Sequence, residues 1–92
     1  MPKGIPRDKS TKHQILHRLK IARGHLDKVI TMAQAGSYCI DIIHQSSAVR
    51  SALGEINKTV LENHLKTCVA HEIKKGKTDE VIGEVMKVME KM

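Results

Sequence analysis

Aromatic side chains are almost absent from this sequence. Its 92 residues include no Phe, no Trp and a single Tyr. Aromatic residues usually supply much of the buried area of a small core, and a chain of this length buries only a modest fraction of its surface as a monomer. A stable fold therefore depends on Leu, Ile, Val and Met, and we expect association between chains to supply further burial.

Long apolar runs are also missing, and cysteines are few. No apolar stretch approaches the roughly 18 residues that a membrane span requires, and no signal-peptide pattern follows the N-terminus. We therefore expect a soluble, cytoplasmic protein. The two cysteines are interpreted as reduced thiols available for metal or redox chemistry, in preference to a disulfide. The Gly-rich, Ser-His-Asp and paired-carboxylate patterns of enzymes are absent, so an enzyme is not expected.

The positive charge is concentrated at one end of the chain. Residues 1–28 contain eight basic and two acidic side chains, whereas residues 29–92 contain eight of each. The first segment thus carries the whole formal net charge of +6. Such a distribution is typical of a protein that binds a polyanion such as nucleic acid. A solvated basic helix surface is the alternative interpretation.

The hydrophobic pattern predicts an all-α fold in a single domain, residues 1–92. A mobile basic arm of residues 1–10 holds both prolines and precedes a helix at about 11–35, whose apolar residues recur three and four apart. That stripe comprises Ile15, Leu19, Ala22, Leu26, Val29 and Ala33. A second, unbroken helix follows at about 38–75, and a third at about 78–91 is expected to fold back onto the far end of the second.

Three residues of the second helix form a candidate metal site. His64 and Cys68 are four apart, so in a helix they share a face and offer an imidazole and a thiolate to a soft metal ion. Cys39 is the obvious third ligand, but 29 residues of helix place it about 43 Å from Cys68. Two antiparallel second helices across a two-fold axis would instead build two identical sites. The alternative is that both cysteines are small core fillers.

Four blocks of the sequence resemble, in order and spacing, the CsoR/RcnR family of metal-responsive bacterial repressors. They are residues 18–20 with 23–27, 38–42, 48–50 and 63–68. The resemblance implies three helices per chain in an antiparallel helical-bundle dimer, and two dimers pairing into a homotetramer. It also implies a repressor that binds operator double-stranded DNA without metal and releases it when metal binds. A metal- or thiol-binding helical oligomer without a DNA role is the alternative.

The candidate ligands Cys39, His64 and Cys68 resemble those of the copper(I) sensors in this family. Two thiolates and one imidazole suit Cu(I), a soft ion that needs no fourth ligand. Nickel and cobalt sensors have a histidine about where this chain has Arg7, and persulfide sensors lack the histidine at position 64. Formaldehyde sensors share Pro2 and Cys39 but lack the second thiol. Each remains an alternative inducer on the same scaffold.

The resemblance also implies residues around the ligands. Tyr38 and Glu84 lie where copper sensors place a tyrosine and a glutamate that link by hydrogen bonds to the ligand histidine, which would fix the tautomer of His64. A core ring and a solvated carboxylate are the simpler interpretations. The sequence leaves open whether His13 or His17 joins the site.

The DNA surface that the resemblance implies is the basic face of the first helix, with help from the second, and its contacts are expected to be mostly to phosphate. The predicted residues are Arg18, Lys20, Arg23, Arg50 and Lys58. Family members carry an arginine where this chain has Glu55, so the extent of the basic surface differs here.

Overall fold

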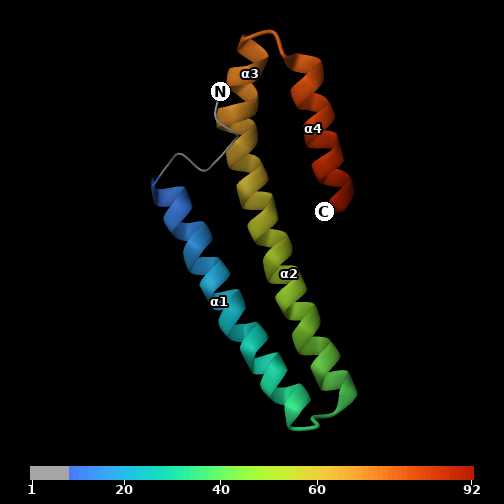
Figure 1. Ribbon diagram of the computed structural model, residues 1–92. Helices are drawn as coiled ribbons and strands as arrows, with labels where there is room; N and C mark the ends of the chain where they lie inside the picture. Colours follow the sequence, from blue (N-terminus) through green and yellow to red (C-terminus); the bar gives the residue numbers. More distant parts are fainter. Residues whose placement is uncertain (1–8) are drawn as a thin grey trace.

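The computed structural model describes residues 9–92, and this part of the chain is helical with two short turns and no strand. Its elements are α1 (Lys9–Gln34), α2 (Cys39–His64), a π-helical turn (Leu65–Val69), α3 (Ala70–Lys74) and α4 (Thr78–Lys91). Leu65 and Ala70, at the two junctions, have right-handed helical backbone angles. The segments from α2 to α3 therefore form one continuous rod, and the all-α prediction with three helices per chain is confirmed (Figure 1).

The helix bounds differ in detail from the sequence-based expectation. α1 begins at Lys9, so the last two residues of the predicted arm are helical, and the rest of that arm lies outside the described residues. The second helix was expected to be a regular α-helix over 38–75. The rod spans residues 39–74, but the π-helical turn at Leu65–Val69 interrupts its α-helical hydrogen bonding.

Two glycines end the long helices in the same way. Gly36 has a φ of 70° and Gly76 a φ of 84°. After α1, the amide of Gly36 donates to the carbonyl of Ala33 and the amide of Ser37 to that of Met32. This pair of bonds is the Schellman motif, which needs a left-handed residue at its centre. The helix is thus closed by a residue without a Cβ, and the chain reverses into α2.

Gly36→Ala and Gly24→Ala are expected to change stability in opposite directions. Alanine at position 36 must adopt a left-handed conformation, which lowers the free energy of unfolding by about 1–2 kcal/mol. Gly24 lies inside α1, and open space surrounds the point where a Cβ would lie, so alanine there should raise that energy by about 1 kcal/mol. Urea unfolding at one fixed protein concentration measures both. Equal effects of the two substitutions would contradict the helix ending described here.

α1 and α2 run antiparallel (Figure 1), and the residues that each buries are seven apart along its helix. The buried residues of α1 are Ile15, Ala22 and Val29, and those of α2 are Val49 and Ile56. The predicted stripe of α1 is therefore only half covered, because Leu19 and Leu26 are 39% and 47% exposed. α2, the one helix that packs on α1 within residues 9–92, buries one residue of the stripe in every two turns. The alternate positions need another surface to bury them.

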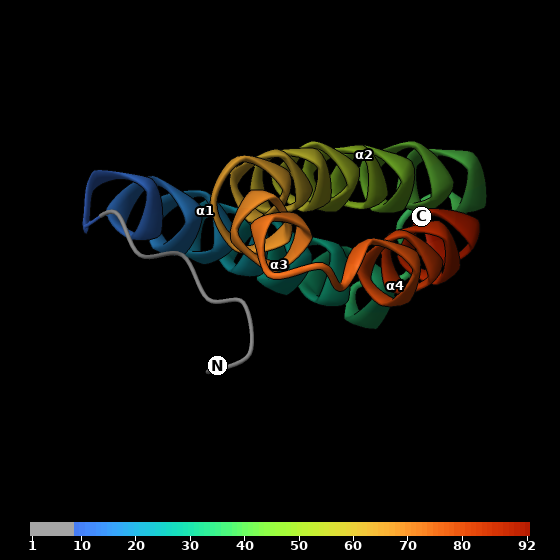
Figure 2. The same ribbon diagram turned by 90° about the horizontal axis from the view of Figure 1, so that it is seen from above.

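α4 folds back beside the far end of the rod, as the sequence predicted (Figures 1 and 2). Val81 and Val85 form a small core with Val69, and Leu61 packs against it. The remaining apolar side chains of this helix are open: Met86 is 55% exposed, for example. The described residues thus leave apolar side chains uncovered on both α1 and α4.

No helix in residues 9–92 is long and apolar enough to cross a membrane.

Candidate metal centre

The three predicted ligands lie at opposite ends of one rod. Cys39 is the first residue of α2 and is exposed, His64 is its last residue, and Cys68 lies in the π-helical turn and is 3% exposed. A rise of 1.5 Å per residue separates Cys39 from His64 by about 38 Å, in a chain whose longest dimension is 55 Å. Within residues 9–92, no three His, Cys, Asp or Glu side chains are grouped closely enough to hold a metal ion.

The segment between His64 and Cys68 is wider than the regular α-helix expected from the sequence. The hydroxyl of Thr67 donates to the carbonyl oxygen of Asn63 at 2.8 Å. Such a side-chain bond competes with the backbone for the i−4 carbonyl, and the backbone here is π-helical. Single π-helical turns occur frequently at functional sites. His64 therefore precedes, and Cys68 lies within, a local irregularity that sequence spacing did not predict.

Thr67 is a residue near the candidate ligands that the sequence pattern did not single out. Its Oγ1 lies 3.4 Å from Sγ of Cys68 as well as bonding the Asn63 carbonyl. The available signal was a hydroxyl residue next to a cysteine in a helix, where Thr often bonds the preceding turn. Thr67 thus links the position of the thiol to the shape of the π-helical turn.

Glu84 of α4 lies close to His64 in the same chain. The distance from its Oε1 to Nε2 of His64 is 3.9 Å, and its side chain is 66% exposed against 25% for the histidine. A carboxylate at this range can orient an imidazole directly after a small rotation, or through a water molecule. Tyr38, the other predicted neighbour, precedes Cys39 at the far end of α2 and is 69% exposed.

His64 also borders a groove between α2 and α4. The groove has a volume of about 390 Å³ and is mainly apolar. Its lining residues are Asn57, Val60, Leu61, His64, Val88, Lys91 and Met92. It exists because α4 packs on the rod through Val81 and Val85 near its start, while its C-terminal half leaves a space beside α2. A groove of this kind could not be predicted from either helix alone.

An ion pair spans the start of the π-helical turn. Lys66 Nζ and Glu62 Oε1 are 2.8 Å apart on the exposed surface of the rod. The hydrogen bond and the charge of Lys66 lower the pKa of the Glu62 carboxyl, and Glu62 raises the pKa of the Lys66 ammonium. The carboxylate's contribution is present at neutral pH and is lost as the pH falls through its lowered pKa. At an exposed site this contribution is small.

Arg18, among the predicted DNA contacts, lies on the side of the chain marked by one interhelical hydrogen bond. His25 Nε2 and Gln45 Oε1 are 2.8 Å apart and join α1 to α2; we call this side the His25–Gln45 flank. Arg18 precedes His25 by seven residues, close to two full turns, so it lies on the same flank. Thr59 follows Gln45 by fourteen residues, close to four turns, so Thr59 also lies on this flank.

The other four predicted DNA contacts do not share that flank. The two on α1 are five and two residues from His25, and the two on α2 are five and thirteen residues from Gln45. These spacings place each side chain about 140–200° around its helix from the residue that marks the flank. The four residues are Lys20, Arg23, Arg50 and Lys58, all exposed. The single basic face expected on the first helix is therefore divided between different sides of one chain, because residues two apart on a helix do not face the same way.

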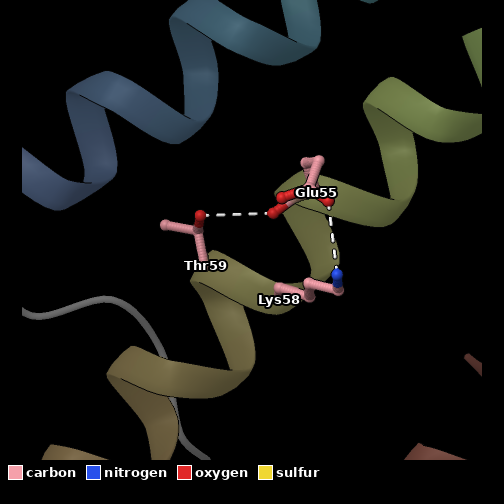
Figure 3. Close-up of polar contacts among 3 residues, drawn as sticks. All are labelled: Glu55, Lys58 and Thr59. Carbon is pink, nitrogen blue, oxygen red and sulfur yellow. Dashed lines mark hydrogen bonds and ion pairs between the residues drawn. The ribbon is translucent and has the colours of Figure 1, made fainter.

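Glu55 is adjacent to the His25–Gln45 flank. Its backbone carbonyl accepts a hydrogen bond from the hydroxyl of Thr59 at 3.2 Å, and its carboxylate contacts the ammonium of Lys58 at 3.3 Å (Figure 3). Both charged side chains are about two thirds exposed, so the pair contributes little to stability. It does place a negative charge on the same side of the chain as Arg18, and it partly neutralises Lys58.

The chain matches known proteins in sequence and in fold. The family model described as "Metal-sensitive transcriptional repressor" matches residues 11–91. The copper-sensing transcriptional repressor CsoR of Mycobacterium ulcerans (strain Agy99) is 43% identical over 75 residues, covering 82% of this chain and 64% of that protein. CsoR of Bacillus subtilis (strain 168) is 38% identical over 80 residues, covering 87% and 79%. The chain therefore spans somewhat less than two thirds of the mycobacterial relative's length.

Two solved structures share the fold. The crystal structure of the copper-sensing repressor CsoR with Cu(I) from Geobacillus thermodenitrificans NG80-2 superimposes with a TM-score of 0.87 at 36% identity, covering 96% of this chain and 92% of that one. The nickel-responsive transcriptional regulator InrS has a TM-score of 0.73 at 22% identity, covering 98% of each chain, and supports the fold alone. The resemblance found in the sequence is confirmed: this chain belongs to the family of metal-sensitive transcriptional repressors.

Proposed function

We propose that this protein is a copper(I)-responsive transcriptional repressor, which binds operator DNA without metal and releases it when Cu(I) binds. The observation that carries the proposal is the donor set: two thiols and one imidazole, with His64 directly before a π-helical turn and the buried Cys68 within it. Thiolates and imidazole suit a soft monovalent ion. The copper-sensing relatives and the structural neighbour with Cu(I) support the same choice of metal.

The proposed site is shared between two chains. His64 and Cys68 come from one chain and Cys39 of the partner subunit supplies the third ligand, since about 38–43 Å of rod separates these residues within a chain. If Cys39 faces a point near residue 66 of an antiparallel partner, the two-fold axis crosses α2 midway, between Ala52 and Leu53. The 41% exposure of Leu53 supports a contact there, because an apolar side chain on such an axis meets its own copy.

The exposed apolar side chains support a larger assembly. Leu19 and Leu26 of α1 remain open after α2 has packed, and so do Met86 and Met89 of α4. Large apolar side chains gathered on an exposed surface are typical of sites where another chain packs. We propose that the first set is buried in the antiparallel dimer and that the second is buried when two dimers form a homotetramer.

Residues around the ligands would hold the imidazole in place. Glu84, 3.9 Å from His64 Nε2, is positioned to accept a hydrogen bond from the ring nitrogen that does not bind metal, and Tyr38 of the partner subunit would approach the same site together with its neighbouring cysteine. Bound Cu(I) supplies bonds that connect the two chains. A metal that favours one arrangement of the chains and DNA that favours another are coupled reciprocally.

The proposed DNA surface uses the five exposed cations named above, drawn from several chains of the assembly. Arg18 and Lys20 of one chain lie on different sides of α1. A duplex that contacts both residues must therefore reach them on different subunits, or with different parts of the DNA backbone. We assign Leu19 and Leu26 of α1 to the dimer interface, which leaves the His25–Gln45 flank open to DNA. In the cytoplasm, where the repressor would act, the thiols remain reduced.

A gel-shift titration tests the proposed function. A candidate operator duplex from the region upstream of the protein's own gene and an unrelated duplex are titrated with the metal-free protein under reducing conditions, and the titration is repeated with one Cu(I) per chain. We expect a complex without metal and its loss with Cu(I), while Ni²⁺ at the same concentration leaves it intact. A complex that Cu(I) leaves unchanged would exclude the copper response, and no complex in either state would exclude the repressor function.

Glu55→Gln is expected to tighten binding to any duplex several-fold. The substitution removes a negative charge adjacent to the His25–Gln45 flank, on which Arg18 lies, and frees Lys58 from its 3.3 Å ion pair. Arg18 and Lys58 then both become available to phosphate. Binding of operator and of unrelated DNA is measured by fluorescence anisotropy at two salt concentrations. Glu90→Gln, an equal charge change on the exposed surface of α4, is the matched control. If both substitutions raise the affinity for DNA equally, the effect comes from net charge and not from the position of Glu55.

A further inference from the structure

His13 and His17 form a pair on α1 that the proposed copper site does not use. They are four residues apart in a regular helix, and both are exposed. Their ring centroids are 6.5 Å apart and the ring planes differ by only 9°. The two imidazoles are therefore side by side and similarly oriented on the helix surface.

The pair faces away from the rest of the chain. Ile15, which is buried against α2, is two residues from each histidine, and two residues correspond to about 200° around a helix. Both rings therefore lie on the side of α1 opposite α2, with Lys20 one turn further along. No part of the chain in residues 9–92 needs to move for a ligand to reach them.

The donor chemistry of this pair differs from that of the thiol site. Two imidazoles four apart on a helix are a known arrangement for binding zinc, and imidazole nitrogen suits borderline divalent ions such as Zn²⁺, Ni²⁺ and Cu²⁺. Among the described residues, no third His, Cys, Asp or Glu completes a cluster there. Water would fill the remaining positions, so an ion at this site would be exchangeable.

We propose that His13 and His17 form a second metal site, which binds one divalent ion of the zinc type per chain. The ion would tie together two successive turns of α1 through His13 and His17. An ion that binds only the helical state stabilises that state by mass action. Lys12 and Lys20 lie nearby on the same helix and oppose the bound charge, which keeps the affinity moderate.

A zinc titration of the full chain, followed by calorimetry, tests the proposal. The first arm uses Cys39→Ser/Cys68→Ser protein, in which thiolates cannot take the zinc, and we expect one Zn²⁺ per chain. Adding either His13→Gln or His17→Gln should abolish that uptake, whereas His71→Gln, a change at an exposed histidine of α3, should leave it unchanged. No uptake by the folded thiol-free protein, or uptake that survives His13→Gln, would overturn the proposal.

A second arm covers the case in which the buried Cys68→Ser change prevents folding. Wild-type protein and its His13→Gln/His17→Gln variant are compared, and the variant should bind one Zn²⁺ fewer per chain. In the wild type, zinc should also shift the proton NMR signals of the two ring systems. If the wild type and the variant bind the same number of Zn²⁺ ions per chain, the two histidines are a stacked surface pair that binds no metal, and the proposal is overturned. Since neither arm uses Cu(I) or DNA, the outcome is independent of the proposed repressor function.

Discussion

Mixing the Cys39→Ser chain with the Cys68→Ser chain is expected to restore Cu(I) sites that each variant has lost. Each homodimer alone lacks one ligand in both of its sites. In a mixed dimer, the intact Cys39 of one chain meets the intact His64 and Cys68 of the other, so one site is complete and the second lacks both thiols. A site built within a single chain could not be restored in this way.

The expected size of the recovery follows from pairing statistics. Random pairing of equal amounts makes half of the dimers mixed, and each mixed dimer has one complete site of two. The mixture should therefore bind about a quarter of the Cu(I) that wild type binds, after chains have exchanged in mild denaturant. The measurement is Cu(I) bound in competition with a chromophoric chelator under reducing conditions.

Controls separate loss of a ligand from loss of the fold. Each single variant should remain helical and associated, because the proposed role of these residues is metal binding. Cys68 is the exception to watch, since it is 3% exposed beside the small core of Val69. If Cys68→Ser unfolds, the same exchange is performed with His64→Ala, which lies in a more open position. If neither mixture recovers Cu(I) binding, the proposal of a site shared between two chains is wrong.

Arg18→Ala should weaken operator binding about ten- to hundredfold for each copy that contacts phosphate. Losing a charge-assisted hydrogen bond removes roughly 1.5–3 kcal/mol of binding free energy, and each 1.4 kcal/mol is a factor of ten. Each lost phosphate contact should also reduce the slope of log affinity against log salt by about 0.9. Affinity measured from 50 to 300 mM salt gives both quantities. The Cu(I) affinity without DNA should not change.

Two further substitutions show where on the chain DNA binds. Lys20→Ala removes the same charge from a different side of α1, so a smaller effect than that of Arg18→Ala places the duplex on the His25–Gln45 flank. Lys87→Ala, on the exposed surface of α4, controls for net charge. If Arg18→Ala leaves both affinity and slope unchanged while Lys20→Ala reduces them, DNA binds the side of α1 that carries His13 and His17.

Much of this fold was readable from local patterns in the sequence. The three- and four-residue spacing of apolar side chains located the helices, because it matches the periodicity of the α-helix. Glycines at positions 36 and 76 follow the two long helical segments, and glycine commonly ends a helix because it adopts the left-handed conformation that other residues avoid. The spacing of His64 and Cys68, with Cys39 far along the same rod, already indicated that one chain could not complete a metal site. Those inferences needed only helix geometry.

Other features depend on how the helices meet and on details of hydrogen bonding. Whether Leu19 and Leu26 would be covered depends on how many neighbours α1 has, and one chain provides a single helix against it. The π-helical turn, in which the hydroxyl of Thr67 bonds the carbonyl of Asn63, is a detail that hydrophobic spacing does not report.

The surroundings of the site were decided by tertiary structure for a similar reason. Glu84 is 20 residues from His64 in the sequence, and only the fold-back of α4 brings their side chains to 3.9 Å. The 390 Å³ groove beside His64 exists because α4 packs on the rod near its start and leaves space further along. The sequence thus determined the helices and the chemistry of the candidate ligands, since both follow from residue types and their spacing along a helix. Only tertiary structure decided which side chains surround the ligands and which sides of α1 and α2 stay open, because those depend on the angle and extent of contact between helices.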